Sequence, residues 1–145
     1  MEQQEKITVN LVGERERMSF LPRLFKNYFM RCENHVYQLA GKLSENYQGG
    51  TWEFAEASNG ALYMRPEAEE DEKFSVSSEN YYSGELSADA FGILCTFLTV
   101  NNMCWMLADE NAPQEKLKHF IDMNYLIRDV LLEHQEKHEL IPAID

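Results

Sequence analysis

The chain of 145 residues is poor in cysteine, and this scarcity restricts the classes of protein that it can belong to. Its three cysteines, Cys32, Cys95 and Cys104, are odd in number, lack CxxC spacing and fall within helical patterns. That pattern favours reduced thiols packed in an interior over a disulfide framework. Nothing basic flanks Cys104, so a buried structural cysteine is favoured there over a reactive thiol.

Long hydrophobic runs are also missing. The longest strongly apolar run, residues 91–100, is interrupted by Asn101 and Asn102 and is shorter than the roughly 20 residues that span a bilayer. The first six residues carry two acids, and no apolar segment follows them as it would in a secretory signal. We therefore expect no membrane span and a cytoplasmic location.

Catalytic and cofactor motifs are absent from the sequence, which contains no GxSxG, GxxxxGK[ST], GxGxxG or HExxH. We expect no catalytic residue and no cofactor. His134 and His138 stand four apart, a spacing that can hold a metal ion on a helix. The nearby glutamate is Glu136 rather than the residue after the first histidine, so two exposed histidines near a helix C-terminus are favoured over a metal site.

Two carboxylates beside aromatic residues leave an enzymatic alternative open. Glu53 and Glu85 would suit general acid and base catalysis if the fold brought them together. No spacing in the sequence does so, and the favoured interpretation is that Glu53 projects from a strand while Glu85 orders the turn before Ser87. Trp52 and Tyr82 are interpreted first as core aromatics, although both residue types also favour interfaces.

Basic residues are scarce: 13 Lys and Arg against 25 Asp and Glu give a net charge of −12. This balance disfavours direct binding to nucleic-acid phosphates. A folded monomer of this size is expected to have roughly 7,700 Å² of accessible surface, so the net charge corresponds to about one charge per 640 Å². B-DNA carries about one charge per 100 Å². The sharpest acidic cluster, residues 67–72, could imitate DNA locally, but a solvated loop is the favoured interpretation.

Hydrophobic periodicity predicts a single α+β domain over residues 1–145, in which a small antiparallel sheet packs against about four helices, one of them central and buried. We expect strands over 6–12, 51–57, 61–65 and 74–77. The Asn59-Gly60 pair is typical of a tight hairpin turn with positive φ at both residues. The last three strands would then form a small meander.

Capping signals and periodicity predict the helices. They are expected from a cap at Ser19 to about Tyr28, over 32–47, from a cap at Ser87 to about Leu107, and from the start signal at 111–113 onward through the two histidines. The helix after Ser87 is apolar on nearly every side, which is typical of a central, buried helix. Residues 141–145 are expected to be extended.

Residues 52–92 carry the most specific motifs of the chain. They are Trp52-Glu53-Phe54, Ser58 to Met64, and Tyr82 to Gly92. Further motifs follow the same order: Arg17-Met18, Phe20-Leu21-Pro22, Glu33 with Val36-Tyr37, Gly49-Gly50, Asn102 and the terminal Ala143-Ile144-Asp145. In combination these motifs resemble those of the KlcA/ArdB family of plasmid and mobile-element antirestriction proteins, over nearly the whole chain.

The resemblance implies a small, acidic, non-enzymatic bacterial protein that relieves type I restriction–modification of incoming unmodified DNA. It implies action by protein–protein interaction, with a type I restriction enzyme or a factor controlling it as the partner. An acidic DNA-mimic decoy and a hydrolase using the Glu53/Glu85 region remain the alternatives, and the oligomeric state is left open. Candidate contact residues, chosen as polar or amphipathic members of these motifs, are Arg17, Glu33, Trp52, Glu53, Glu85 and Asp145.

Overall fold

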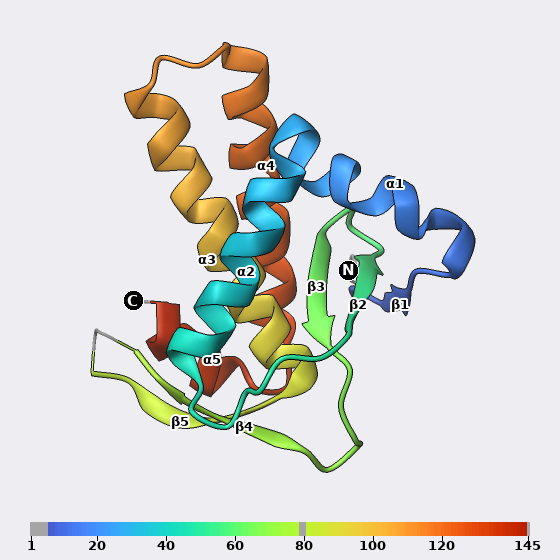
Figure 1. The fold of residues 1–145 in the computed structure, drawn as a ribbon, viewed down its shortest axis with the longest axis vertical. Coiled ribbons are helices and arrows are strands. Elements are labelled where there is room, and N and C mark those ends of the chain that lie inside the picture. The colour runs from blue at the N-terminus through green and yellow to red at the C-terminus, as the bar shows by residue number, and fades with distance from the viewer. Residues whose placement is uncertain (1–5, 79–80, 145) are drawn as a thin grey trace, which may run out of the picture.

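The computed structural model describes residues 6–78 and 81–144, and it has the predicted α+β architecture (Figure 1). The strands are β1 (Val9–Leu11), β2 (Trp52–Ala57), β3 (Leu62–Pro66), β4 (Lys73–Ser77) and β5 (Ser83–Ser87). The helices are α1 (Glu14–Phe25), a 3-10 turn η1 (Lys26–Tyr28), α2 (Phe29–Leu43), α3 (Ala88–Asp109), α4 (Gln114–Glu133) and α5 (Lys137–Ile144).

One three-stranded antiparallel sheet has the order β1-β2-β3. The β2–β3 hairpin turns where the sequence predicts, but of its two central residues only Gly60 has a positive φ, of 98°. Asn59 acts through its side chain instead: the oxygen accepts from Ala61 N at 3.0 Å and the amide donates to Leu126 O at 3.0 Å. The turn therefore also ties the hairpin to α4.

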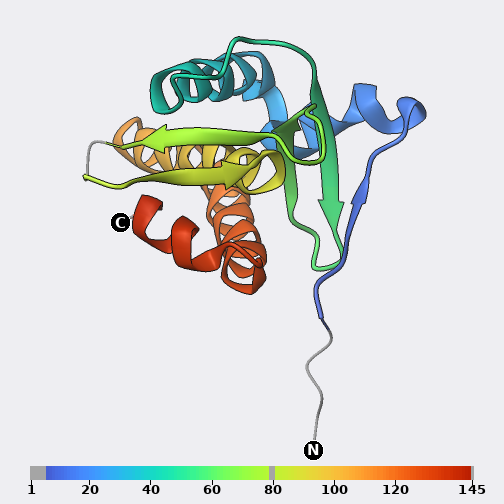
Figure 2. The ribbon, with the colours of Figure 1, turned by 90° about the horizontal axis from the view of Figure 1, so that it is seen from below.

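The predicted meander is wrong, because β4 pairs with β5 in a separate two-stranded sheet. The segment Ser83–Ser87 has weak strand propensity by itself, which is why a turn was expected there. Pairing supplies the missing driving force: Leu86 stands opposite Phe74 and both are buried. Figure 2 shows this hairpin lying between α2 on one side and α5 on the other.

Two helix starts differ from the prediction. Helix α1 begins at Glu14 with Gly13 as its N-cap residue, and the Ser19 hydroxyl donates to Glu16 O rather than capping a helix. The acids Glu14 and Glu16 in the first turn favour this earlier start, because they face the positive end of the helix dipole. Helix α2 likewise begins before Cys32 and ends at Leu43, so the predicted last turn to residue 47 is absent.

The extended tail predicted for residues 141–145 is also wrong, since α5 continues to Ile144. Pro142 suggests an end to the helix, but Leu140 and Ala143 are buried against the core and hold the segment helical. The histidine pair is divided as a result: His134 ends α4, and His138 lies on α5.

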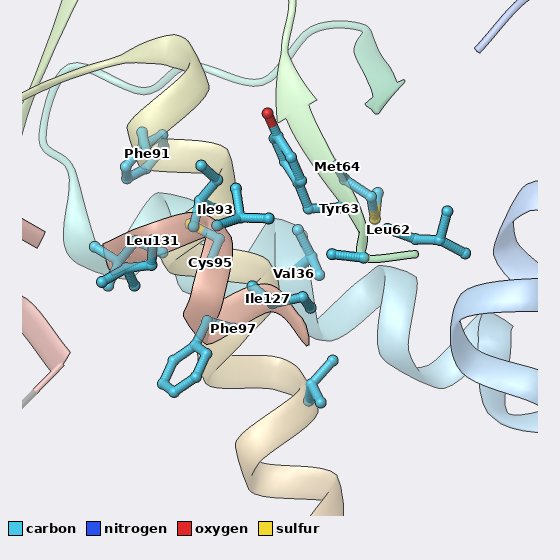
Figure 3. Packing of buried hydrophobic residues seen from close by; sticks show 14 of the residues in the cluster. Val36, Leu62, Tyr63, Met64, Phe91, Ile93, Cys95, Phe97, Ile127 and Leu131 are labelled. Carbon is cyan, nitrogen blue, oxygen red and sulfur yellow. The ribbon is translucent and has the colours of Figure 1, made fainter. Parts of the chain in front are cut away.

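Helix α3 forms the centre of the core, as predicted. It is long and apolar enough to cross a membrane by length and composition, but 67% of its apolar window is buried within the fold, which is typical of a core helix. In Figure 3, Ile93 and Cys95 of α3 lie among side chains of α2, β3 and α4, including Val36, Tyr63 and Ile127.

Helix α3 packs directly on the backbone of β3 at Gly92. A Cβ at this position would overlap the carbonyl oxygen of Met64 and the Cα of Arg65. The Thr96 hydroxyl accepts from Met64 N at 3.1 Å and lies 3.3 Å from Met64 O, so side-chain hydrogen bonds fasten the two elements at this point. Glycine is required here by the close approach of backbone to backbone.

Candidate functional site

The largest polar network among the described residues is built on Asp89, in the first turn of α3. One carboxylate oxygen accepts from the Tyr63 hydroxyl at 2.6 Å and from Arg65 Nη1 at 3.0 Å. The other oxygen lies 2.9 Å from His134 Nε2 at the end of α4. Arg65 Nε also donates to Glu53 at 2.9 Å, so the network joins β2, β3, α3 and α4.

Both ring nitrogens of His134 have partners in this network. The Glu136 backbone N–H donates to His134 Nδ1 at 3.0 Å, so Nδ1 carries a lone pair and Nε2 carries the hydrogen that is donated to Asp89. The Glu136 carboxylate in turn accepts from the backbone N–H and the hydroxyl of Ser87. The Ser87 hydroxyl accepts from Ala90 N at 3.2 Å, which confirms the predicted N-cap.

Burial and hydrogen bonding act in opposite directions on Asp89. Burial disfavours its charged form, but hydrogen bonds from His134, Tyr63 and Arg65 outweigh this effect and hold the pKa of Asp89 below its usual value. Burial, with the neighbouring Asp89 carboxylate, raises the pKa of the Tyr63 hydroxyl. Asp89 is therefore a fixed negative charge near the positive end of α3.

A cavity of about 260 Å³ opens beside this network, and the acidic loop 67–72 forms part of its wall. Glu53, Arg65 and Asp89 line it from the sheet and α3, and Glu69, Glu70 and Glu72 line it from the loop. The loop residues are solvent-exposed, as predicted for residues 67–72. The arrangement is an acidic recess whose inner carboxylates are already paired with an arginine.

The chemistry available to this recess is limited by its own hydrogen bonds. Both ring nitrogens of His134 are engaged, and the Ser87 hydroxyl donates to a carboxylate and accepts from Ala90 N. Nucleophilic catalysis needs a hydroxyl or thiol within reach of a base with a free lone pair. The network contains no nucleophile next to a base with a free lone pair. Its hydrogen bonds connect the start of α3 with the ends of α4 and β5, which is a structural role.

The five candidate contact residues that the structure describes lie on the helices α1 and α2 and on the strands β2 and β5 of the two sheets. Trp52 is 4% exposed and its indole donates to the Tyr47 hydroxyl at 2.8 Å, so its selection as a contact residue is wrong and its interpretation as a core aromatic is confirmed. Glu53 is paired with Arg65. Glu85 lies exposed on β5, opposite Ser75, rather than in the predicted turn.

Of the remaining candidates, two lie on α1 and α2, and Tyr37, the neighbour of Glu33, packs on Trp52 with a ring-centroid distance of 5.6 Å. Arg17 is partly buried on α1, and its Nε is buried without a hydrogen bond to the described residues. Glu33 lies beside Tyr37 on α2; burial, together with this carboxylate, raises the pKa of Tyr37 to about 12. Asp145 lies outside the described residues.

Sequence reasoning recognised Ser87 and Asp89 as the start of a helix but missed the network that they anchor. Tyr63 and Arg65 lie on one strand at alternate positions, and no local pattern links them to α3. The prediction of His134 as exposed is wrong, because its side chain is only 14% exposed and bonds across 45 residues to Asp89. Only the tertiary fold brings these residues together.

Comparisons with known proteins agree with this fold. The family model described as antirestriction protein matches residues 45–145. Two antirestriction proteins KlcA of Escherichia coli are 34% and 36% identical to the chain, over 99% and 96% of it and 98% and 94% of their own lengths. A solved structure, described as showing that KlcA and ArdB have a novel fold and antirestriction activity against type I DNA restriction systems in vivo but not in vitro, is 32% identical, with a TM-score of 0.83 and full coverage of both chains.

The fold is therefore that of the antirestriction class of small α+β proteins. The chain belongs to the KlcA/ArdB family of antirestriction proteins.

Proposed function

We propose that the chain relieves type I restriction of incoming unmodified DNA in the bacterial cytoplasm, in the service of a mobile element. The observation that carries this proposal is the similarity over the full length to a structure whose proteins act against type I restriction systems in vivo. The match covers 100% of each chain, with a TM-score of 0.83.

We further propose that the mechanism is protein–protein interaction rather than extensive DNA mimicry. The net charge of −12 is spread over 9071 Å² of accessible surface, several-fold more dilute than the roughly one charge per 100 Å² of B-DNA. Two carboxylates of the acidic recess, Glu53 and Asp89, are paired with Arg65. A row of evenly spaced, unpaired carboxylates would suit mimicry better.

The partner that we propose is the restriction complex or a factor that controls it. The solved relatives act in vivo but not in vitro, which favours a component or condition that the cell supplies. The test is the plating efficiency of unmodified phage on a type I restricting host, with modified phage as the control for adsorption and growth. The protein should raise plating of unmodified phage alone; no increase would overturn the proposal.

The acidic decoy is the second candidate, because every residue of loop 67–72 is exposed. Its test is a variant in which Glu67, Glu69, Glu70 and Glu72 become Gln and Asp71 becomes Asn. A decoy would lose restriction relief in this variant, and its binding to the enzyme would weaken as salt is added. Retention of relief by the variant would exclude mimicry by this loop.

A further inference from the structure

A second, non-acidic cavity lies on the molecule between α2 and α3, where Figure 1 shows α2 crossing α3. It measures about 170 Å³. The buried side chains Cys32, Thr99 and Met103 form its inner wall, and the exposed Arg31 and Asn102 form its rim. Asn102 is one of the motif residues that the fold leaves unexplained, since it is exposed on the central helix.

The inner wall carries no formal charge and is largely apolar, with the Thr99 hydroxyl and the His35 ring as its polar groups. The Thr99 hydroxyl donates to Cys95 O at 2.9 Å, so its oxygen accepts from His35 Nδ1, also at 2.9 Å. Burial lowers the pKa of His35 and raises that of Cys32 to about 12, so both side chains are neutral at pH 7. A ligand in the cavity therefore meets one formal charge, that of Arg31.

Arg31 differs from the paired arginines of the chain. Arg23 binds Glu56 and Arg65 binds Glu53 and Asp89, whereas Arg31 Nη2 contacts the thioether sulfur of Met106 at 2.9 Å. Within the described residues, Arg31 makes no ion pair, although the chain holds 25 acids. A thioether is a weak acceptor, so most of the donor capacity of this guanidinium is available to a ligand.

The lining of the cavity selects the chemistry of that ligand. It contains no acid, and it places the guanidinium of Arg31 at the same rim as the side-chain amide of Asn102. Guanidinium and amide donors suit a carboxylate, which a guanidinium can bind with two parallel hydrogen bonds. The volume of about 170 Å³ admits a side chain rather than a cofactor.

An exposed tryptophan stands about one turn of α3 from the rim residue Asn102. Trp105 is 71% exposed and stands three residues after Asn102, so the two side chains are neighbours on the surface of α3. Tryptophan and arginine are the residue types most enriched among those that dominate protein interfaces. An exposed tryptophan one helical turn from Asn102, on a surface where Arg31 makes no ion pair with the described residues, is typical of a docking surface.

We propose that the cavity and Trp105 form a docking surface for a protein partner, whose Asp or Glu carboxylate enters the cavity and binds Arg31 and Asn102. The identity of this partner rests on the proposed antirestriction function. The carboxylate preference does not, since it follows from the lining of the cavity alone.

The direct test is an NMR titration of the isotope-labelled protein with the N-acetyl, N-methylamide derivative of aspartate. We expect saturable shifts of the Arg31 Nε–H and Asn102 side-chain amide signals, and none with the asparagine analogue. Asn102→Asp places a competing carboxylate at the rim and should weaken binding of the aspartate probe by about tenfold or more. Gln38→Glu is the matched control, because it adds the same charge on α2 about 10 Å along the helix from Arg31 and outside the cavity.

Absence of saturable shifts would overturn the proposal, and so would an equal response to inorganic phosphate, which would indicate a general anion site. The same variants are then assayed for restriction relief, after thermal unfolding has shown that they fold like the wild type. Asn102→Asp and Trp105→Ala should lose most relief while Gln38→Glu retains it. If the wild type gives no relief, the proposed function fails and the titration still stands; if wild type and both variants relieve restriction equally, the docking surface fails alone.

Discussion

The contact between α3 and β3 predicts opposite effects for one substitution at two glycines. Gly92→Ala and Gly41→Ala both place alanine inside a helix, which by helix propensity alone stabilises the fold by about 0.5 to 1 kcal/mol. At Gly41 nothing lies within 4 Å of the added Cβ, so this gain should be realised. At Gly92 the added carbon overlaps the backbone of Met64 and Arg65.

The cost at Gly92 follows from what has to move. Overpacking a well-packed core costs about 1 to 3 kcal/mol, and here the obstacle is strand backbone rather than the end of a flexible side chain. If α3 separates from β3, the hydrogen bonds between Thr96 and Met64 are strained as well, each with a net value of about 1 kcal/mol. We expect a net destabilisation of about 2 to 4 kcal/mol.

Urea denaturation followed by circular dichroism measures both variants. With a slope of about 2 kcal/mol per molar urea, Gly92→Ala should lower the midpoint by about 1 to 2 M, and Gly41→Ala should raise it slightly. A Gly92→Ala protein as stable as the wild type would refute the close packing of α3 on β3. A destabilised Gly41→Ala protein would refute the open environment assigned to that position.

Three further predictions concern titration and reactivity. The pKa of Asp89 is depressed in the folded state, so the contribution of this carboxylate to stability is present above about pH 4 and is lost as the pH falls through the folded pKa. Asp89→Asn should therefore lower the free energy of unfolding by about 2 kcal/mol at pH 7. In denaturation series from pH 6 to pH 3, the variant should lose less stability than the wild type. Burial depresses the pKa values of His35 and His119, so below about pH 6.5 the unfolded chain binds more protons than the folded protein. The free energy of unfolding should therefore fall between pH 7 and pH 5. Replacing both histidines with Gln should make this fall smaller, and an unchanged fall would contradict their burial. Burial raises the pKa of Cys32 to about 12 and also raises that of the fully buried Cys95. Mass spectrometry should therefore find both thiols unmodified after treatment of the folded protein with iodoacetamide at pH 8, and alkylated after the same treatment in urea. Rapid labelling without urea would contradict the packing of these thiols.

Local signals predicted the parts of the fold that local chemistry controls. The Ser87 cap, the buried apolar helix after it and the hairpin turn at Gly60 each depend on residues within a few positions of one another. The pairing of β4 with β5 depends instead on burial of Phe74 and Leu86, and the helical tail depends on packing of Leu140. Such tertiary contacts override weak local propensity, so the strand and the helix were missed.

The candidate site was predicted less well than the fold. A polar or amphipathic residue in a motif does not reveal its partners, so the sequence does not show that Trp52 belongs to the core. His134 was placed in solvent because its neighbours in sequence are charged, whereas its partner is Asp89 on another helix. The sequence does not show that Arg31 lacks an ion pair within the described residues, because this depends on how the fold places the acidic side chains.

The most direct measurement of the central claim is the plating ratio of unmodified to modified phage on a type I restricting host, with and without expression of the protein. We expect expression to raise this ratio on the restricting host and to leave it unchanged on an isogenic host without the restriction enzyme. An unchanged ratio on the restricting host, with the folded protein present in the cells, would contradict the account.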